Sequence, residues 1–235
     1  IDRARWAHAG EYVSGPPTDP SYVAFCLDRP PLGDRRARQA LALAVDRQDL
    51  ACVALRGTCA PATGGLVPPS MPAHSPQLGL GYDPQRARAL LAEAGFPEGR
   101  GFPTMTLMTH ADPLSPAAAA YLTEQWHEVL GVACRPEALN WEDFFARLQT
   151  SPPHAVLWGW TVDYLDPDNV LRVGMGQVLP YTHWQNERYT NLVQRARITS
   201  DEKRRVDLYR QAERLLADEI PLLPLAYVRS HRLGK

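Results

Sequence analysis

The sequence predicts an α/β protein with an open, mostly mixed sheet flanked by helices. Short apolar runs that suit strands alternate along the chain with segments whose apolar residues recur at helical spacing. Of the 235 residues, 45% are hydrophobic and 22% are charged, which is typical of a globular protein with a sizeable core. Proline clusters separate the segments, and neither an internal repeat nor a long linker divides the chain, so we expect one domain.

The first half of the chain predicts one strand and two helices. Residues 22–27 are apolar, aromatic and β-branched, which suits a buried strand. A helix is expected after Asp34, a suitable N-cap, because apolar residues then recur at helical spacing. Residues 56–82 are rich in Gly and Pro and show no period. The clearest helix lies within residues 83–95, where an Asp-Pro pair begins it and a glycine ends it.

The second half continues the alternation of strands and helices. Its predicted elements are, in order, a strand at 104–109, a helix at 116–130 closed by Gly131, a strand at 132–138, a helix at 141–149, a strand at 155–158, a loop through Asp168, helices at 187–198 and 200–218, and a strand at 222–228. The first three of these form a β-α-β unit. Trp126, Leu130 and Trp141 fall at helical spacings or at element starts, so we expect them in the core.

The charge balance of the chain argues against nucleic-acid binding, and its hydropathy argues against a membrane-spanning helix. The chain carries 25 Lys and Arg against 26 Asp and Glu, and this near balance predicts no nucleic-acid binding by the domain. No stretch approaches the roughly 20 consecutive apolar residues that span a bilayer. The first residues show neither Met nor a signal-peptide pattern, so we expect any targeting segment to have been removed or to lie outside this piece.

The four cysteines leave two interpretations open. They are Cys26, Cys52, Cys59 and Cys134, and no C-x-x-C motif is present, so a zinc site is not expected. Cys52 and Cys59 are the close pair. They could form a disulfide between a helix end and the next loop, which would suit an extracytoplasmic protein, or remain as two buried thiols.

A search for catalytic or cofactor motifs predicts neither an enzyme nor a cofactor. The two closest histidines in sequence, His110 and His127, are too far apart to form a ligand pair on one helix. The chain contains no G-x-S-x-G elbow, no P-loop and no complete dinucleotide fingerprint. An EF-hand loop starting at Asp163 would place Asp168 at its required glycine and Gly174 at its required glutamate, so no metal site is expected.

One loop instead predicts ligand recognition. Asp163 follows Trp158 and Trp160 at the expected C-terminal end of a strand, which is where open α/β sheets bind ligands. A carboxylate there can hold an ammonium group by a charge-assisted hydrogen bond while the indoles cover apolar parts of the ligand. If Trp160 faces the ligand, Trp158 lies on the same side of the strand. Asp166, followed by Pro167, is predicted to cap a helix.

The order of several motifs resembles a known family. Residues 25–47 combine a strand end, Pro-Pro, an Asp, Arg-Gln-Ala-Leu and Asp-Arg. Further landmarks follow in the same order: Pro61-Ala62-Thr63 with Pro68-Pro69, Tyr82-Asp83-Pro84 running into residues 90–96, residues 159–169, Asn186 before a helix, and residues 213–224. In these motifs the chain resembles the peptide/nickel-type (family 5) solute-binding proteins that feed bacterial ABC importers.

The resemblance implies one lobe of a venus-flytrap, periplasmic-binding-protein-like fold that closes on its ligand without catalysis. It implies an N-terminal crossing segment at 1–20, the second large lobe of the family at 21–230 and a C-terminal tail at 231–235. The partners implied are a peptide or similar small solute, the missing first lobe of the same protein and an ABC permease. The implied location is extracytoplasmic, either periplasmic or on a membrane-anchored lipoprotein.

The resemblance also implies ligand contacts. Asp163 matches the aspartate that pairs with the ligand's α-ammonium group, and Trp160 matches an aromatic wall residue. The expected ligand-binding set is completed by Trp158, Thr161 and Tyr164. Some peptide-binding relatives carry an arginine on the preceding strand, whereas residues 155–157 are uncharged here. Because one lobe carries half a site, we expect this piece alone to bind weakly or not at all.

Two other functions remain compatible with the sequence. Some relatives use such a lobe as the solute sensor of a cytoplasmic transcription regulator with a separate DNA-binding domain, which an upstream helix-turn-helix pattern would reveal. An enzyme is the third possibility, because a fold does not determine a function and a site assembled by folding is invisible in one sequence.

Overall fold

The computed structural model describes residues 10–112 and 114–233. Its strands are β1 (Tyr12–Phe25), β2 (Cys59–Pro61), β3 (Met105–His110), β4 (Cys134–Leu139), β5 (Ala155–Gly159) and β6 (Leu222–Leu233). Its helices are α2 (Arg35–Leu43), α3 (Arg47–Asp49), η1 (Leu50–Ala54), α4 (Pro84–Glu93), η2 (Pro97–Gly99), α5 (Ser115–Leu130), α6 (Trp141–Thr150), η3 (Asn169–Gly174), α7 (Met175–Thr182), α8 (Glu187–Ile198) and α9 (Glu202–Glu219).

The strands form a single mixed sheet in the order β2-β6-β1-β5-β3-β4. The β3 strand runs parallel to both β4 and β5, as the predicted β-α-β unit requires. The β1 strand pairs antiparallel with β5 on one side and with β6 on the other. The predicted α/β class with an open mixed sheet is confirmed.

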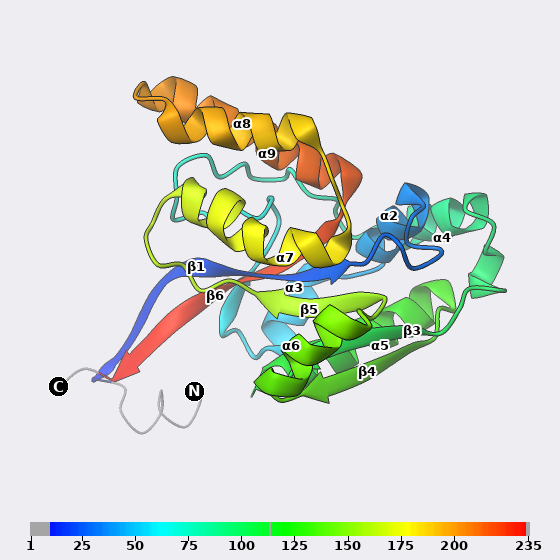
Figure 1. Ribbon diagram of the computed structural model, residues 1–235. Coiled ribbons are helices and arrows are strands. Elements are labelled where there is room, and N and C mark those ends of the chain that lie inside the picture. The colour runs from blue at the N-terminus through cyan, green and yellow to red at the C-terminus, as the bar shows by residue number, and fades with distance from the viewer. Residues whose placement is uncertain (1–9, 113, 234–235) are drawn as a thin grey trace.

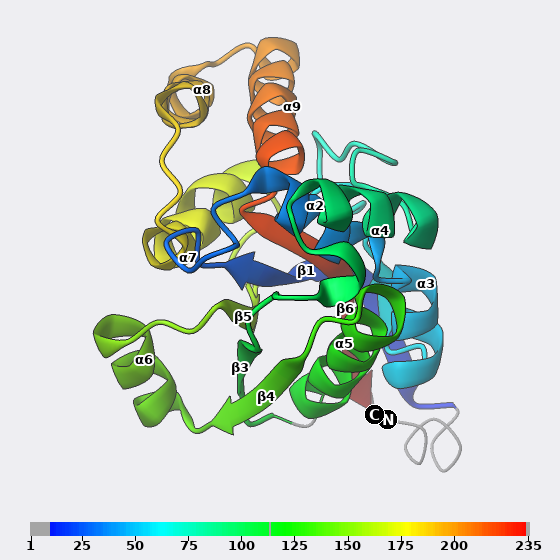
Figure 2. The ribbon, with the colours of Figure 1, turned by 90° about the vertical axis from the view of Figure 1, so that its right-hand side faces the viewer.

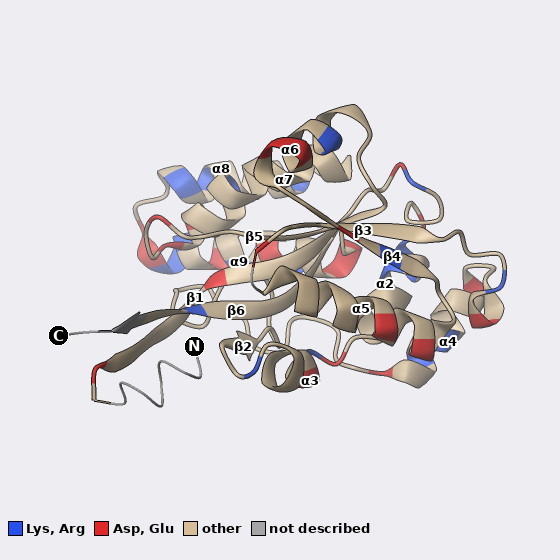
Figure 3. Ribbon diagram, turned by 90° about the horizontal axis from the view of Figure 1, so that it is seen from below, with Lys and Arg blue, Asp and Glu red and all other residues tan. Residues whose placement is uncertain are grey.

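Helices cover both faces of the sheet, as the two perpendicular views show (Figures 1 and 2). The β1 strand explains why: Val23 and Phe25 belong to the core shared with α2, α4 and α5, whereas Tyr22 and Ala24 belong to the core shared with α7, α8 and α9. Because side chains alternate along a strand, a run that is apolar at every position is buried on both faces. Charged residues accordingly lie mainly on the helices and loops, and the strands are mostly tan in Figure 3.

The predicted helix boundaries follow their capping residues. The Asp34 side chain accepts a hydrogen bond from the Arg36 amide, and the Asp83 side chain accepts one from the Arg86 amide. Gly131 ends α5 with a φ of 69°, a left-handed conformation that glycine adopts without steric cost. Three helical regions of the described residues were not among the predicted helices: residues 47–54, η2, and the stretch from η3 through α7, of which only a start after Asp166 was expected.

The first and last strands are longer than the sequence predicts. The β1 strand begins at Tyr12 and pairs with β6 across register shifts on both sides of Pro17. These irregularities accommodate prolines, which lack a backbone donor, inside a strand that contains one of the proline clusters expected to separate elements. Together β1 and β6 leave the body as a two-stranded ribbon (Figure 1). No helix within the described residues is both long and apolar enough to cross a membrane.

Trp126 illustrates the packing of α5 against α2. Its side chain is fully buried, and its Nε1 donates a hydrogen bond of 3.0 Å to the carbonyl of Leu41. The expected core positions of Trp126 and Leu130 are therefore confirmed. Replacing Trp126 by Phe should lower the free energy of unfolding by about 2 kcal/mol, because it leaves a small void and an unpaired buried carbonyl. Denaturant unfolding of the two proteins would measure this, and an unchanged midpoint would contradict it.

Candidate functional site

A pocket of about 450 Å³ lies at the carboxyl ends of the parallel strands β3 and β5. Its walls come from these strand ends, from β1 and β6, and from the first turns of α5 and α6. Its volume is within the range of small-molecule sites, and open α/β sheets place such sites at this edge. Because β1 lies next to β5 in the sheet, residues of β1 complete the pocket wall beside the end of β5.

Three of the five residues expected to bind ligand line this pocket. They are Trp158, at the end of β5, and Trp160 and Thr161, in the loop that follows. Trp158 and Trp160 are partly buried on the α7 side of the sheet, so both indoles lie on one side as the strand period predicts. Asp163 and Tyr164, the other two, lie farther along the same loop and outside the pocket wall.

The α6 helix adds an aromatic wall that the sequence did not predict. Trp141 was expected in the core, but it is 50% exposed and lines the pocket, because it occupies the first position of α6 at the edge of the sheet. Its ring stacks on His110 with centroids 3.9 Å apart and on Phe145 at 5.3 Å. This wall could have been anticipated from His110, because it directly follows a predicted strand and ligand sites form at the ends of such strands.

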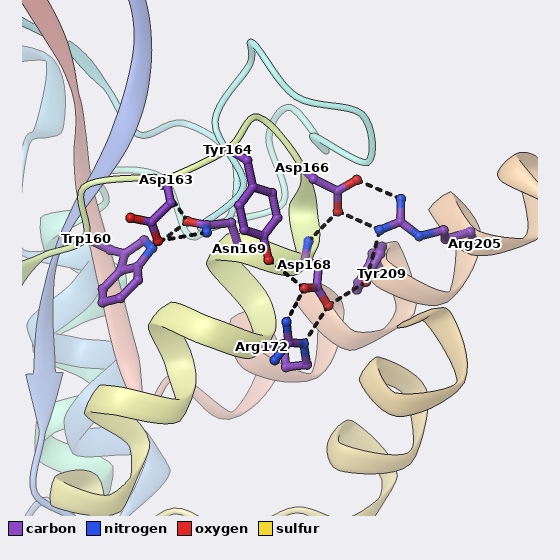
Figure 4. A network of polar contacts seen from close by, with 9 residues as sticks. All are labelled: Trp160, Asp163, Tyr164, Asp166, Asp168, Asn169, Arg172, Arg205 and Tyr209. Carbon is purple, nitrogen blue, oxygen red and sulfur yellow. Dashed lines mark hydrogen bonds and ion pairs between the residues drawn. The ribbon is translucent and has the colours of Figure 1, made fainter. Parts of the chain in front are cut away.

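Asp163 is held in place by Asn169, at the start of η3 (Figure 4). The Asn169 side chain is fully buried, donates a hydrogen bond of 3.2 Å from Nδ2 to Asp163 Oδ2, and accepts one from the Asp163 amide. The same Asn169 oxygen accepts a hydrogen bond of 2.8 Å from Trp160 Nε1. One buried amide therefore orients both the exposed carboxylate and the pocket indole. The sequence search did not identify Asn169 as a positioning residue.

The neighbouring carboxylates of the loop are structural. The Asp166 side chain accepts a hydrogen bond of 2.8 Å from the Asp168 amide, and helical structure begins at Pro167, just before η3, so its predicted role as a helix cap is confirmed. Arg205 of α9 donates to both Asp166 oxygens, at 2.6 and 2.8 Å. The loop that carries Asp163 is thereby tied to α9.

Asp168 is the centre of a second set of bonds (Figure 4). Arg172 donates two hydrogen bonds to its carboxylate, and the hydroxyls of Tyr164 and Tyr209 donate one each. Burial acts to raise the pKa of this carboxyl, but the hydrogen bonds from Arg172 and the two tyrosines outweigh it and hold the pKa below its usual range. Tyr164, expected to contact ligand, thus has its hydroxyl engaged, although the residue is 44% exposed.

Asp112 occupies the amino end of α5 at the pocket wall. Its Oδ1 accepts hydrogen bonds from the amides of Leu114 and Ser115, and its Oδ2 accepts one from the Ser115 hydroxyl. The His110 ring nitrogen lies 3.8 Å from the same Oδ2. Burial acts to raise the pKa of Asp112, but the bonds from Ser115 and Leu114 bring it below its ordinary value, so the carboxylate stays ionised at neutral pH.

The cysteines do not contribute to the pocket. Cys52 and Cys59 are both free thiols, the first exposed and the second buried, so the structure contains neither the disulfide nor two buried thiols. Burial raises the pKa of Cys59 to about 11, which keeps it protonated at neutral pH.

The amino-acid sequence of the chain is similar to those of several known proteins. A sequence model of "Bacterial extracellular solute-binding proteins, family 5 Middle" matches residues 3–177. The dipeptide-binding protein of Escherichia coli (strain K12) is 30% identical over 214 residues, and heme-binding protein A of Haemophilus influenzae is 28% identical over 214 residues. Each alignment covers 88% of this chain.

A solved structure has the same fold. The dipeptide-binding protein of Pseudoalteromonas sp. SM9913 in complex with Met-Leu superposes with a TM-score of 0.86 at 24% identity, over 97% of this chain and 47% of that one. The chain spans about two fifths of the length of the curated relatives, 40% for the E. coli protein and 39% for the H. influenzae protein. By the match of the family model to most of its length, the chain belongs to the bacterial extracellular solute-binding proteins of family 5.

Proposed function

We propose that this chain is the ligand-binding lobe of an ABC-importer substrate-binding protein for peptides or similar small solutes. The observation that carries the proposal is that buried Asn169 orients both the exposed Asp163 carboxylate, just beyond the pocket wall, and Trp160, an indole of that wall. The relatives' names, which specify dipeptide and heme binding, support a small-solute ligand. The full protein would enclose this ligand between the lobe and a first lobe that lies outside this chain.

The chemistry of Asp163 suits an ammonium group. Only Oδ2 of its carboxylate is engaged by a side-chain donor in the described structure, so the group can accept further hydrogen bonds. A peptide α-ammonium offers three donors and a full positive charge, which gives hydrogen bonds stronger than neutral ones. The indole of Trp160, fixed by the same Asn169, would cover the adjacent apolar part of the ligand.

The domain division belongs to the same proposal. The lobe would comprise residues 21–230, with 1–20 as a crossing segment and 231–235 as a tail. Strands β1 and β6 run past both boundaries and pair with each other, as connections leading to a second lobe would. A paired ribbon of this kind can bend as a unit, which supports closure by movement of whole lobes.

A binding role is favoured over catalysis by the polar groups of the pocket. Ser115 carries a hydroxyl in the same wall as His110 and Asp112, but its Oγ donates to Asp112 and not to a histidine base. A serine nucleophile needs a base that accepts its proton, and within the described residues Ser115 has no such arrangement. We therefore propose a non-catalytic, extracytoplasmic protein that delivers its ligand to an ABC permease. The relatives' names support this function over the regulator alternative.

The test is Asp163→Asn in the full-length protein. We expect affinity for peptides with a free amino terminus to fall about tenfold or more, because the variant loses the charge but keeps the size of the side chain. The affinity for N-acetylated peptides should fall little, because these peptides lack the ammonium group. Isothermal titration against one dipeptide and its acetylated form would measure both. Asp207→Asn, an exposed carboxylate on α9, is the matched control and should bind like the wild type.

Two results would contradict the proposal. Unchanged affinity of Asp163→Asn for amine-bearing peptides would exclude the role of Asp163. Absence of binding by the wild-type full-length protein to any peptide or other small solute, in a thermal-shift screen, would exclude the binding function itself.

A further inference from the structure

Apart from His110, whose ring nitrogen lies 3.8 Å from Asp112, the ionisable side chains that line the pocket at the carboxyl ends of β3 and β5 are acidic. Asp19 and Asp112 line it, and neither lysine nor arginine occurs among the described residues of its wall. Both hydrogen bonds that Asp19 accepts from other groups, from the Val162 amide and the Thr18 hydroxyl, end on Oδ1. Within the described part of the chain, Asp19 Oδ2 therefore accepts no hydrogen bond from another group; Asp19 lies on β1, beside the loop that leads to Asp163.

The amino end of α5 cannot serve as an anion site in this pocket. Exposed amides at a helix start commonly bind carboxylate or phosphate groups. Here the Leu114 and Ser115 amides and the Ser115 hydroxyl already donate to Asp112. A ligand carboxylate would have to displace a side chain of the same charge. The pocket therefore disfavours an anionic group at the place where its fold would otherwise accept one.

The aromatic wall suits a planar cation. Trp141 is half exposed and stacked on His110, and Trp158 packs edge-on against Phe144 within the same wall. The Asp112 side chain, 35% exposed, lies on the His110 side of this stack. Guanidinium groups stack on aromatic faces and pair with carboxylates through several donors, and ammonium groups do so as point charges.

We propose that this pocket binds a basic side chain of the ligand, with arginine as the best fit, so that the protein selects cationic peptides. The inference rests on the proposed peptide-binding function and adds the class of peptide. Asp112 and Asp19 supply the opposite charge, and Trp141 supplies the stacking face. The pocket of about 450 Å³ is large enough for one such side chain and part of its backbone.

The experiment compares the full-length protein's affinity for three tripeptides: Ala-Arg-Ala, Ala-citrulline-Ala and Ala-Glu-Ala. Citrulline has nearly the shape of arginine without its charge, so the ratio of the first two affinities isolates the charge. We expect the arginine peptide to bind about tenfold more tightly than the citrulline peptide, and the glutamate peptide to bind weakest. The ratio should fall as salt is raised, because the carboxylates are partly solvent exposed.

Variants locate the effect. Asp112→Asn keeps an oxygen for the α5 cap and should reduce the arginine-to-citrulline ratio severalfold, with the unliganded melting temperature recorded to show that the variant folds. Trp141→Leu, at a half-exposed position with no capping role, should weaken the arginine peptide without touching either carboxylate. Asp207→Asn should leave the ratio unchanged.

The outcomes separate this inference from the proposed function. Binding of all three peptides with equal affinity, or tighter binding of the glutamate peptide, would overturn charge selection while leaving peptide binding in place. An arginine-to-citrulline affinity ratio that is unchanged in both Asp112→Asn and Trp141→Leu would exclude this pocket as the source of the selectivity. Failure of all three peptides to bind would overturn this inference, whereas the proposed function would be excluded only if the thermal-shift screen also found no other small solute.

Discussion

Replacing Asp168 by alanine is expected to lower the free energy of unfolding by about 3–5 kcal/mol, the range for breaking a buried ion pair by removing one partner. Asp168 is only 7% exposed and accepts hydrogen bonds from Arg172, Tyr164 and Tyr209. Alanine would leave the partly buried guanidinium and two hydroxyls without their acceptor. Urea unfolding followed by circular dichroism would measure the loss.

The charge of Asp168 gives this prediction a pH dependence. Its pKa in the folded protein is held below the ordinary value, so its stabilising contribution is present above the unfolded pKa and is lost as the pH falls through the folded one. The difference in stability between the wild type and Asp168→Asn should therefore shrink below about pH 4. Asp207→Ala, at an exposed position of α9, should change stability by less than about 0.5 kcal/mol. A similarly small loss for Asp168→Ala would show that the network contributes little.

Glu213→Gln is expected to stabilise the protein increasingly as the pH rises. Glu213 of α9 is 1% exposed; Oε1 accepts a hydrogen bond of 2.7 Å from the Val67 amide, whereas Oε2 has no partner among the described residues. Burial raises its pKa to about 8. Its protonated form is therefore favoured in the fold, and the cost of ionising it appears as the pH increases.

The sign and size of the effect follow from this shift. A folded pKa above the unfolded value gives stability that is complete below the unfolded value near 4.5 and is lost as the pH rises through about 8. The stability of Glu213→Gln relative to the wild type should rise by about 4 kcal/mol between pH 5 and pH 9. Two-state urea unfolding at several pH values would measure the difference.

Other ionisable groups lie near Glu213, and an exposed glutamate on the same helix provides a control. Arg47 lines the same small cavity, but its guanidinium donates to the carbonyls of Leu80 and Pro224, so it does not pair with Glu213. Tyr189 and Tyr227 lie close enough to Glu213 for its negative charge to help raise their pKa values, although burial is the larger cause. Glu202→Gln, an exposed position in the first turn of α9, should show no comparable pH dependence. A constant difference between Glu213→Gln and the wild type would mean that Glu213 is ionised throughout.

Local sequence patterns were sufficient for many elements and for part of the site. The caps Asp34, Asp83 and Asp166 and the terminator Gly131 are recognisable because they act through the backbone of their own helices. The side-chain hydrogen bonds of the three caps span two or three residues and those of the Gly131 amide four or five, so no distant contact is needed to interpret them. The loop that carries Asp163 was identified in the same way, from two tryptophans at the end of a strand.

Other features depend on contacts between segments that are distant in the chain. Trp141 is exposed because α6 begins at the sheet edge, and its partner His110 comes from β3. Proline-containing residues 16–20 form a strand because β6 pairs with them from the far end of the chain. Such pairings outweigh local propensity, which is only a weak prior for a strand.

The sequence by itself thus determined the α/β class, the family resemblance, most helices and the loop that presents Asp163. Only the tertiary structure decided which side chains share the pocket, that Asn169 orients Asp163 and Trp160, and that Trp141 stacks on His110. The physical reason is the range of the interactions. Caps and periodicity act within a few residues, whereas a pocket forms where strand ends and helix starts meet through packing of the whole sheet.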